Sequence, residues 1–179
     1  MKKPTFVVAA ALVALAALAI GPSATAGGGD HIKTDLKGYL EVPAVSTVGR
    51  GAFTARINAA GTQIAYRLSY TDLEASVTQA HIHFAQRSVN GAISVFLCSN
   101  LGNGPAGTQP CPAAPATITG TITASTVTAL AAAQGLDAGE VAELIRAVRA
   151  GRTYVNVHSI KFPGGEIRAQ LNDKDQRDG

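Results

Sequence analysis

Hydrophobic and polar residues alternate along most of the chain beyond residue 35, which is the pattern of strands that bury one face. Residues 63–70 and 116–123 show this alternation most clearly, and Gly, Pro, Asn or Ser residues separate the alternating stretches. Strands are expected at residues 36–42, 52–58, 63–70, 77–84, 93–97, 116–123, 153–159 and 166–171. About eight short strands of this kind predict an all-β fold, either an antiparallel β-sandwich or a flattened barrel.

One stretch before the last two strands has the spacing of a helix instead. Apolar residues recur at helical intervals over residues 141–148, and Gly151 follows them. Asp137 and Glu140 precede this stretch at the spacing of a capping box, with Asp137 as the N-cap. A shorter helix is expected over residues 126–134. The sequence therefore predicts one helical insertion before the final hairpin.

The first residues have the composition of an export signal rather than of a folded domain. Lys2 and Lys3 are followed by an apolar run over residues 6–20, which is too short for a membrane-spanning helix. Ala24 and Ala26 then supply the small-residue pattern that signal peptidase recognises. This is the pattern of a cleaved secretory signal peptide, and an uncleaved N-terminal anchor is the alternative.

These features divide the chain into a signal peptide at residues 1–26, a flexible lead at 27–35, one domain at 36–171 and a polar tail at 172–179. No second long apolar run follows the signal, so no membrane span is expected after its removal. The expected location is outside the cell, in the periplasm or in the cell envelope.

The charge of the chain argues against nucleic acid as a partner. The formal net charge is +3, and removal of Lys2 and Lys3 with the signal peptide would reduce it to +1. Basic residues do not cluster with aromatic residues in the way that nucleic-acid-binding surfaces require. We therefore expect no binding of DNA or RNA.

Cys98 and Cys111 are the two cysteines of the chain. A disulfide is the default state of such a pair in an exported protein, and it would close a loop rich in Gly, Pro and Asn. A pair of thiolate metal ligands is the alternative, but the C-x-x-C spacing typical of such sites is absent. The sequence therefore favours a disulfide between Cys98 and Cys111.

Three of the four histidines are expected on one face of the sheet. Because side chains alternate between faces along a strand, His81 and His83 share the face opposite Ile82. By the same rule, Asn156 and His158 share the face opposite the apolar residues of their strand. Neutral imidazole is a good ligand for copper and zinc, so the pattern favours one such ion bound by His81, His83 and His158.

A carboxylate or amide could complete this site or orient one of its histidines. The final hairpin places His158 opposite either Glu166 or Arg168, depending on the register of the turn. Glu166, Glu41 from the opening strand and Asn156 are the candidates for this role.

A second interpretation needs no metal. In it, His81 and His83 are partly buried and join the sheet to a covering loop through hydrogen bonds. His31 lies in the predicted lead and is expected to be incidental to either arrangement.

Signatures of catalysis are weak in this chain. There is no Ser in a G-x-S-x-G setting and no acidic pair beside an obvious cleft, and no glycine-rich stretch precedes a phosphate-binding helix. The four histidines are too few for the paired metal sites of a copper–zinc superoxide dismutase. We therefore expect a binding module rather than an enzyme.

Four motifs in order resemble the CHRD (chordin) domain family. Residues 40–51 resemble its E-V-P-P-V…G-x-G opening, and residues 80–83 its A-H-I-H motif. Residues 154–159 resemble its Y-V-N-V-H-T motif, and residues 163–171 its P-G-G-E-I-R-G-Q-L ending. The likeness runs over residues 36–171, essentially the whole chain after the predicted signal and lead.

This resemblance implies an all-β extracellular domain, as in the animal morphogen antagonist chordin and in stand-alone secreted proteins of microbes. It implies a fold more than an activity. The chain departs from the family pattern at Ala44, where a second proline is usual, and at Phe84 and Ala169, where glycines are usual. Phe84 is expected to narrow access to the histidine face beside His83.

Together the motifs and the parity of the histidines predict a secreted CHRD-domain binding module that holds one copper or zinc ion. The alternatives are a structural or adhesive extracellular module without a metal and, less favoured, a small metalloenzyme.

Overall fold

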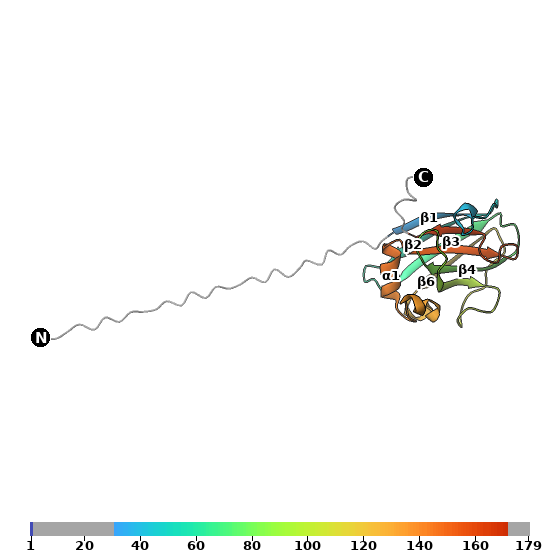
Figure 1. Cartoon of the computed structure of the whole chain (residues 1–179). Coiled ribbons are helices and arrows are strands. Elements are labelled where there is room, and N and C mark those ends of the chain that lie inside the picture. The colour runs from blue at the N-terminus through green and yellow to red at the C-terminus, as the bar shows by residue number, and fades with distance from the viewer. Residues whose placement is uncertain (2–30, 172–179) are drawn as a thin grey trace.

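The computed structural model of the protein describes Met1 and residues 31–171, so the rest of the predicted signal peptide and the predicted polar tail lie outside the described residues (Figure 1). The elements in chain order are β1 (His31–Lys37), η1 (Gly38–Leu40), β2 (Arg50–Ile57), β3 (Ile64–Thr71), β4 (Val77–Phe84), β5 (Ala92–Ser99), β6 (Ala116–Ile122), η2 (Ala124–Thr126), η3 (Ala129–Gln134), α1 (Val141–Arg149), β7 (Thr153–Ser159) and β8 (Ile167–Gln170). The prediction of an all-β fold of about eight strands, with helical elements before the last hairpin, is confirmed.

The eight strands form one antiparallel sheet in the order β5-β4-β7-β8-β1-β2-β3-β6. The two edge strands approach each other, because Gln109 Nε2 donates to the carbonyl oxygens of Leu97 in β5 at 3.0 Å and of Thr119 in β6 at 3.2 Å. Tyr66 Oη of β3 donates to the same Leu97 oxygen at 3.2 Å. The sheet is therefore a nearly closed, flattened barrel (Figure 1).

The inside of this barrel is the apolar core. Alternate residues of each strand point into it, as Ile64 and Leu68 do in β3. Leu144 and Val148 on the apolar side of α1 join the same core, and Figure 1 shows α1 lying across one end of the strands. Burial of each such side chain stabilises the fold by about 1.5–3 kcal/mol.

The first strand lies earlier in the chain than the sequence pattern suggests. β1 covers most of the predicted lead, and Ile32 and Leu36 are its buried residues. The expected strand at residues 36–42 is instead interrupted after Lys37 by η1. Gly38 explains the turn, because its backbone approaches the carbonyl oxygen of Val45 too closely to leave room for a Cβ atom.

The helical insertion also differs in detail. Glu140, rather than Asp137, is the N-cap of α1. The Asp137 amide donates to Glu140 Oε2 at 2.9 Å, so half of the predicted capping box forms. The shorter helix is a 3-10 helix, η3, that begins at Ala129 after its cap Thr128.

The disulfide between Cys98 and Cys111 is confirmed, and both cysteines are buried. It joins β5 to the long connection that leads to β6. The same connection carries Gln109, so the disulfide holds the segment that bridges the two edges of the barrel.

Three connections cover the outer side of β7 and β8. We call them the cover and define it as residues 38–49, 85–91 and 160–166. Asn90 links two of them by donating through Nδ2 to the carbonyl oxygen of Val42 at 2.8 Å. As a result, both faces of β7 and β8 are buried.

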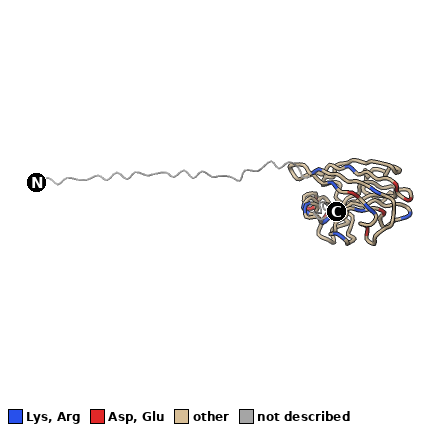
Figure 2. The backbone as a smooth tube through the Cα atoms, turned by 90° about the horizontal axis from the view of Figure 1, so that it is seen from above, with Lys and Arg blue, Asp and Glu red and all other residues tan. Residues whose placement is uncertain are grey.

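The cover changes the environment of three side chains that alternation alone directs to solvent. Glu166, Arg168 and Gln170 do lie on the face opposite Ile167 and Ala169, but they are only 0%, 2% and 3% exposed. Charged residues elsewhere are dispersed: Figure 2 shows Lys and Arg interspersed with Asp and Glu over the described barrel.

Candidate metal centre

The three histidines of the expected site lie together on β4 and β7, which are neighbours in the sheet. The antiparallel register pairs His81 with Asn156, so that His158 follows two positions later on the same face. One ring nitrogen from each of His81, His83 and His158 lies within 4.8 Å of the other two. The three residues could therefore hold one metal ion between them.

Carbonyl oxygens of the cover fix the orientation of two of the rings. Nδ1 of His158 lies 2.9 Å from the Pro163 oxygen, and Nδ1 of His83 lies 2.9 Å from the Gly91 oxygen. Because a carbonyl oxygen only accepts hydrogen bonds, each Nδ1 must carry the proton. Each neutral ring then presents an unprotonated Nε2, the form that binds a metal.

His81 completes the cluster and has no exposed surface. Its Nδ1 lies 3.3 Å from His158 Nε2, and its own Nε2 is buried without a hydrogen-bond partner. His83 Nε2 is also buried without a partner. Buried polar atoms are normally satisfied, so two such nitrogens in one cluster make it a candidate site for a ligand.

The separation of 3.3 Å between His81 Nδ1 and His158 Nε2 has a direct geometric meaning. Nitrogen ligands about 2.0–2.1 Å from a tetrahedral ion lie about 3.3–3.4 Å from each other. These two nitrogens are therefore already at the spacing of neighbouring ligands, and the third histidine is within 4.8 Å.

The ring of His158 is in conflict with its surroundings when no ion is bound. Its Nδ1 faces the Pro163 oxygen at 2.9 Å, while its Nε2 faces Asn156 Oδ1 at 3.1 Å. A neutral imidazole has one proton for these two oxygen acceptors. A cation on Nε2 would remove the repulsion and could also take Asn156 Oδ1 as a ligand.

Rotation of the Asn156 amide would only move this conflict. The amide lies between His158 and the carboxylate of Glu41, since a Cβ atom on Gly165 would contact both Glu41 and Asn156. Turning the amide would satisfy His158 Nε2 with an N–H group but would direct the amide oxygen at the carboxylate. Two changes would remove the repulsion. A proton on Glu41 could be donated to the rotated amide oxygen, or a cation at the histidines could bind the amide oxygen in its present orientation.

Burial keeps the three histidines in the neutral form that metals require. Loss of solvation lowers the pKa of His81 to about 2, with further contributions from the neighbouring His158 and His83. It lowers the pKa of His83 to about 4, and the pKa of His158 is also lowered mainly by burial. All three rings are therefore neutral at pH 7, each with a single proton on its two nitrogens.

Two aromatic residues pack against the histidines. Tyr154 stacks flat on His83, with ring centroids 4.6 Å apart and an interplanar angle of 2°. Phe96 meets His81 edge to face at 4.6 Å. Phe84, expected beside His83, packs against the barrel core instead, so it does not narrow access to the histidine face.

Arg168 and Glu41 are the charged groups closest to this packing. The Arg168 guanidinium lies 3.4 Å above the Tyr154 ring, on a cation–π contact, and donates to Asn90 Oδ1 at 3.0 Å. Burial raises the pKa of Glu41 to about 7, although the nearby Arg168 and the Asn156 amide oppose this rise.

Glu166 is tied to the cover through one carboxylate oxygen, while its Oε2 is buried without a hydrogen-bond partner. The register pairs Asn156 with Arg168 and ends at Val157 and Ile167, so Arg168 is not opposite His158. The next hydrogen bond runs from the Glu166 amide to the Val157 oxygen at 2.8 Å. The Oε1 atom of Glu166 accepts hydrogen bonds from Thr47 Oγ1 and from the Glu74 amide, both at 2.8 Å. Glu166 therefore anchors the cover, while Asn156 is the candidate that reaches the histidines and Glu41 contacts Asn156.

Sequence reasoning misses the carbonyl oxygens of Gly91 and Pro163 and the stack of Arg168 on Tyr154. The stack could have been predicted, because alternation places Tyr154 on the same face of the strand as Asn156 and His158, and Arg168 pairs with Asn156. The carbonyl contacts had no such signal, because they depend on how the cover folds. His31 is exposed on β1, away from the cluster, as expected for an incidental histidine.

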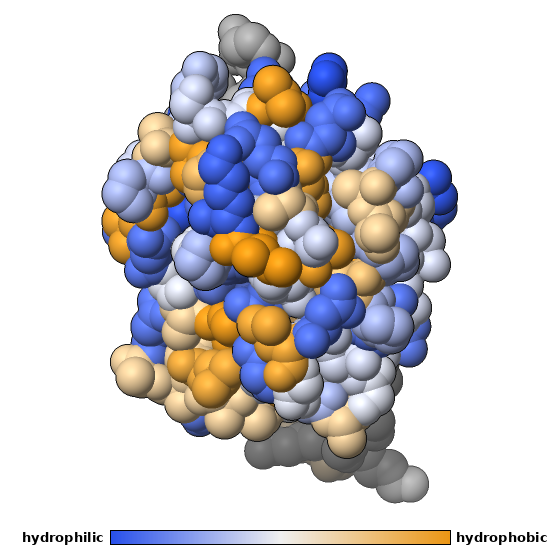
Figure 3. Space-filling view, turned by 90° about the vertical axis from the view of Figure 1, so that its right-hand side faces the viewer, coloured by the Kyte–Doolittle hydropathy of each residue, from blue (hydrophilic) through white to orange (hydrophobic). Residues whose placement is uncertain are grey.

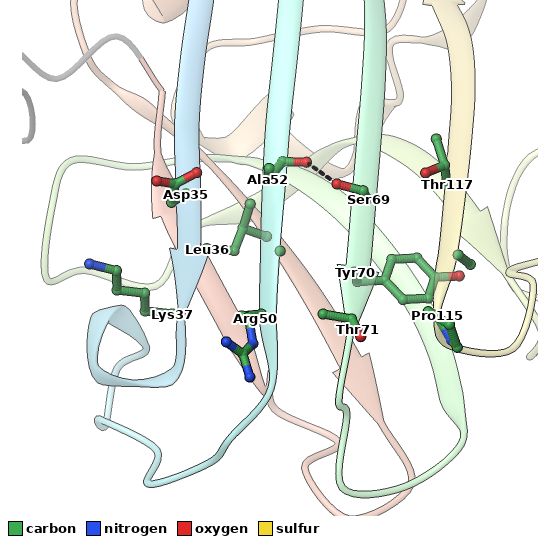
Figure 4. Close-up of a pocket in the computed structure, with 12 residues that line it drawn as sticks. Asp35, Leu36, Lys37, Arg50, Ala52, Ser69, Tyr70, Thr71, Pro115 and Thr117 are labelled. Carbon is green, nitrogen blue, oxygen red and sulfur yellow. Dashed lines mark hydrogen bonds between the residues drawn. The ribbon is translucent and has the colours of Figure 1, made fainter.

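A separate groove of about 650 Å³ lies over β1, β2, β3 and β6 (Figure 4). Ser69 donates to the Ala52 carbonyl oxygen at 3.4 Å within it, and Tyr70 in its lining is only 2% exposed. In the sheet order β8 separates these strands from the histidine strands.

Figure 3, which views the molecule from the side away from α1, shows apolar side chains in groups separated by polar ones. Neither surface offers a cluster of chemical groups comparable to the histidines.

Comparison with known proteins gives one match. The family model described as CHRD domain matches residues 32–171. No curated protein and no solved structure matches the chain. In the part of the chain that the structure describes, no helix has the length and apolar character needed to cross a membrane.

Proposed function

The chain belongs to the CHRD domain family, and we propose that it is a binding module that holds one copper or zinc ion through His81, His83 and His158. The observation that carries this proposal is the state of the ring nitrogens. Two of them are buried without a partner, and a third faces an oxygen acceptor that it has no proton to satisfy. One cation bound by His81 Nδ1, His83 Nε2 and His158 Nε2 would satisfy the nitrogens of His83 and His158, and His81 Nε2 would then carry the proton of its ring.

The surroundings of the cluster resemble the support that metal sites usually have. Histidine ligands generally donate their second nitrogen to a carbonyl or carboxylate, which fixes the ring and its tautomer. Pro163 and Gly91 supply such carbonyl oxygens to His158 and His83. These contacts tie the cover to the sheet and orient two ligands in advance.

Burial favours binding over catalysis. The histidines are 0–8% exposed, and Asn156 Oδ1 is placed to fill a fourth position. Catalytic zinc sites keep one position open for water or substrate, whereas structural sites are closed. The proposed role is therefore non-enzymatic.

We further propose that the protein acts outside the cytoplasm, in a secreted or cell-envelope location. The amino-terminal pattern of a basic start, an apolar run and Ala24-Thr25-Ala26 supports this proposal. The disulfide between Cys98 and Cys111 supports it too, because such bonds persist mainly in oxidising compartments.

The direct test is metal analysis of protein purified without an affinity tag, followed by calorimetric titration of the metal-free protein with Zn²⁺ and with copper. We expect one ion per chain. The double variant His81→Ala, His83→Ala should lose binding, whereas the exposed His31→Ala should retain it as a matched control. Absence of binding at micromolar concentrations, or equal affinity in the double variant, would contradict the proposal.

A second candidate is a structural or adhesive module in which the histidines only join the sheet to the cover. The hydrogen bonds of His83 to Gly91 and of His158 to Pro163 favour it. This candidate predicts that the double variant loses stability but that added metal leaves the melting temperature of the native protein unchanged. A rise in that temperature with copper or zinc would exclude it.

A further inference from the structure

We infer that the histidine cluster is selective for monovalent copper over divalent copper and over zinc, because its ligands are neutral, buried and fixed in position. This inference rests on the proposed metal site and specifies its ligand. It draws on the spacing of the ring nitrogens and on the charges buried around them.

The spacing of the nitrogens argues against divalent copper. Cu²⁺ favours tetragonal arrangements, in which adjacent nitrogens about 2.0 Å from the ion are about 2.8 Å apart and opposite ones about 4.0 Å apart. His81 Nδ1 and His158 Nε2 are 3.3 Å apart. The spacing of this one pair suits a trigonal or tetrahedral ion, for which about 3.3–3.5 Å is expected, while the third nitrogen lies within 4.8 Å of both. Monovalent copper and zinc both accept such geometries.

The fixed rings make this preference hard to relax. Pro163 holds His158 and Gly91 holds His83 through hydrogen bonds of 2.9 Å. Tyr154 stacks on His83, and Phe96 packs against His81. A change to a square arrangement would require rings packed on these partners to move together.

Charge then separates monovalent copper from zinc. The cluster offers three neutral imidazoles and one amide oxygen, so no ligand neutralises the ion. The desolvation energy of an ion grows with the square of its charge, and the ligands here are 0–8% exposed. Transfer from water into this closed site of neutral ligands therefore costs the divalent ion more desolvation energy than the monovalent one.

The nearest buried charges do not change this balance. Arg168 is 2% exposed and stacks on Tyr154, which in turn stacks on His83, so a cation stands behind one ligand. Glu41 is 6% exposed and reaches Asn156 rather than a histidine. Neither charged group is a ligand of the cluster, so the ion keeps most of its own charge.

Binding constants measured on the same metal-free protein test this inference. Under anaerobic, reducing conditions, competition with bicinchoninate gives the affinity for Cu⁺, and competition with a chromogenic indicator gives the affinity for Zn²⁺. Calorimetry without reductant gives the affinity for Cu²⁺. We expect Cu⁺ to bind at least about tenfold more tightly than Zn²⁺, because the extra unit of charge on Zn²⁺ adds an electrostatic cost in a buried site that corresponds to at least that ratio of binding constants.

The Arg168→Gln variant supplies a readout that damage to the fold would not mimic. Coulomb energy is proportional to the charge of the ion, so removal of the cation should tighten both ions, and the factor for Zn²⁺ should be about the square of that for Cu⁺. A damaged fold would weaken both. Glu41→Gln should produce the opposite change, again larger for Zn²⁺.

The outcomes separate this inference from the proposed function. Tighter binding of Cu⁺ than of both divalent ions supports it. Equal or tighter binding of Zn²⁺ or Cu²⁺ overturns the selectivity but leaves the metal site in place. Failure of all three ions to bind overturns the site and the selectivity together.

Discussion

Asn156 and His158 lie two residues apart on β7, and their side chains meet with Oδ1 and Nε2 3.1 Å apart, acceptor to acceptor. His158 is therefore contacted from two sides, by Asn156 at Nε2 and by the Pro163 oxygen at Nδ1. The arrangement makes position 156 the most informative place for substitution.

Asn156→Asp should strengthen metal binding while weakening the metal-free fold. The new carboxylate would face the ion directly and raise its affinity by about tenfold or more. Without the ion, it would lie buried beside Glu41 and lower the free energy of unfolding by about 1–3 kcal/mol. Melting temperatures with and without metal should therefore move apart. Asn156→Ala removes the oxygen and should reduce the difference between the two melting temperatures. An equal increase of this difference in both variants would contradict a role of the position-156 oxygen as a metal ligand.

The metal-free protein should lose stability on acidification below pH 6.5. Burial lowers the pKa of His81 and His83 from 6.5 to about 2 and about 4, so unfolded chains take up protons that the folded chain does not. Glu41 acts in the opposite sense: its pKa rises from 4.5 to about 7, and its stabilising contribution, complete below pH 4.5, is lost as pH rises through 7. Between pH 4.5 and 6.5 the two histidines lower the free energy of unfolding on acidification by more than the single carboxyl group raises it.

The net slope in that window should be about 1.4 kcal/mol per pH unit for each histidine that the carboxylate does not offset. Urea unfolding of chelator-treated protein at several pH values measures it. The His81→Ala, His83→Ala variant should show a much flatter profile. A native protein whose stability is constant from pH 6.5 to 4.5 would show that these rings are not held neutral.

The stack of Arg168, Tyr154 and His83 should be a main source of stability on the covered face. Tyr154→Leu removes a cation–π contact and a ring stack, so the free energy of unfolding should fall by about 2–4 kcal/mol. Tyr154→Phe keeps the ring and is the matched control, with an expected loss below about 1 kcal/mol. Equal losses in the two variants would assign the effect to the hydroxyl group instead of to the stack.

Loss of the disulfide should affect stability but not the metal. Replacing Cys98 and Cys111 by serine frees a loop closed over a sequence separation of 13, which is expected to lower the free energy of unfolding by about 3 kcal/mol. Metal affinity should remain within about twofold of the native value, because the histidines lie on β4 and β7 and take their supports from the cover. A large drop in affinity would mean that the long connection to β6 also positions the cluster.

The sequence was enough to place the histidines on one face, because strand alternation is strict and β4 and β7 are long enough to express it. It was also enough to narrow the partner of His158 to two residues. The register of the hairpin decided between them, and the register depends on a turn whose conformation alternation does not describe. The disulfide followed from the cysteine count and from the expected compartment.

The burial of the histidine face could not be read from alternation. Glu166, Arg168 and Gln170 have the polarity of exposed residues, and their burial depends on the path of connections without periodic structure. The carboxylate of Glu166 is turned toward Thr47 by these connections, although its position in the register is the one expected of a ligand. The first strand was displaced for a related reason, since the close packing of Gly38 on Val45 depends on the cover.

The cover has a kinetic consequence. Pro163 is bound to His158, Gly91 to His83, and Asn90 to both Val42 and Arg168, so the rings of His83 and His158 cannot turn outward while these loops stay closed. An ion in the cluster would then exchange with the medium only as fast as the loops separate, however weak or strong its equilibrium affinity. Residence time and affinity would thus be set by different residues of the same chain.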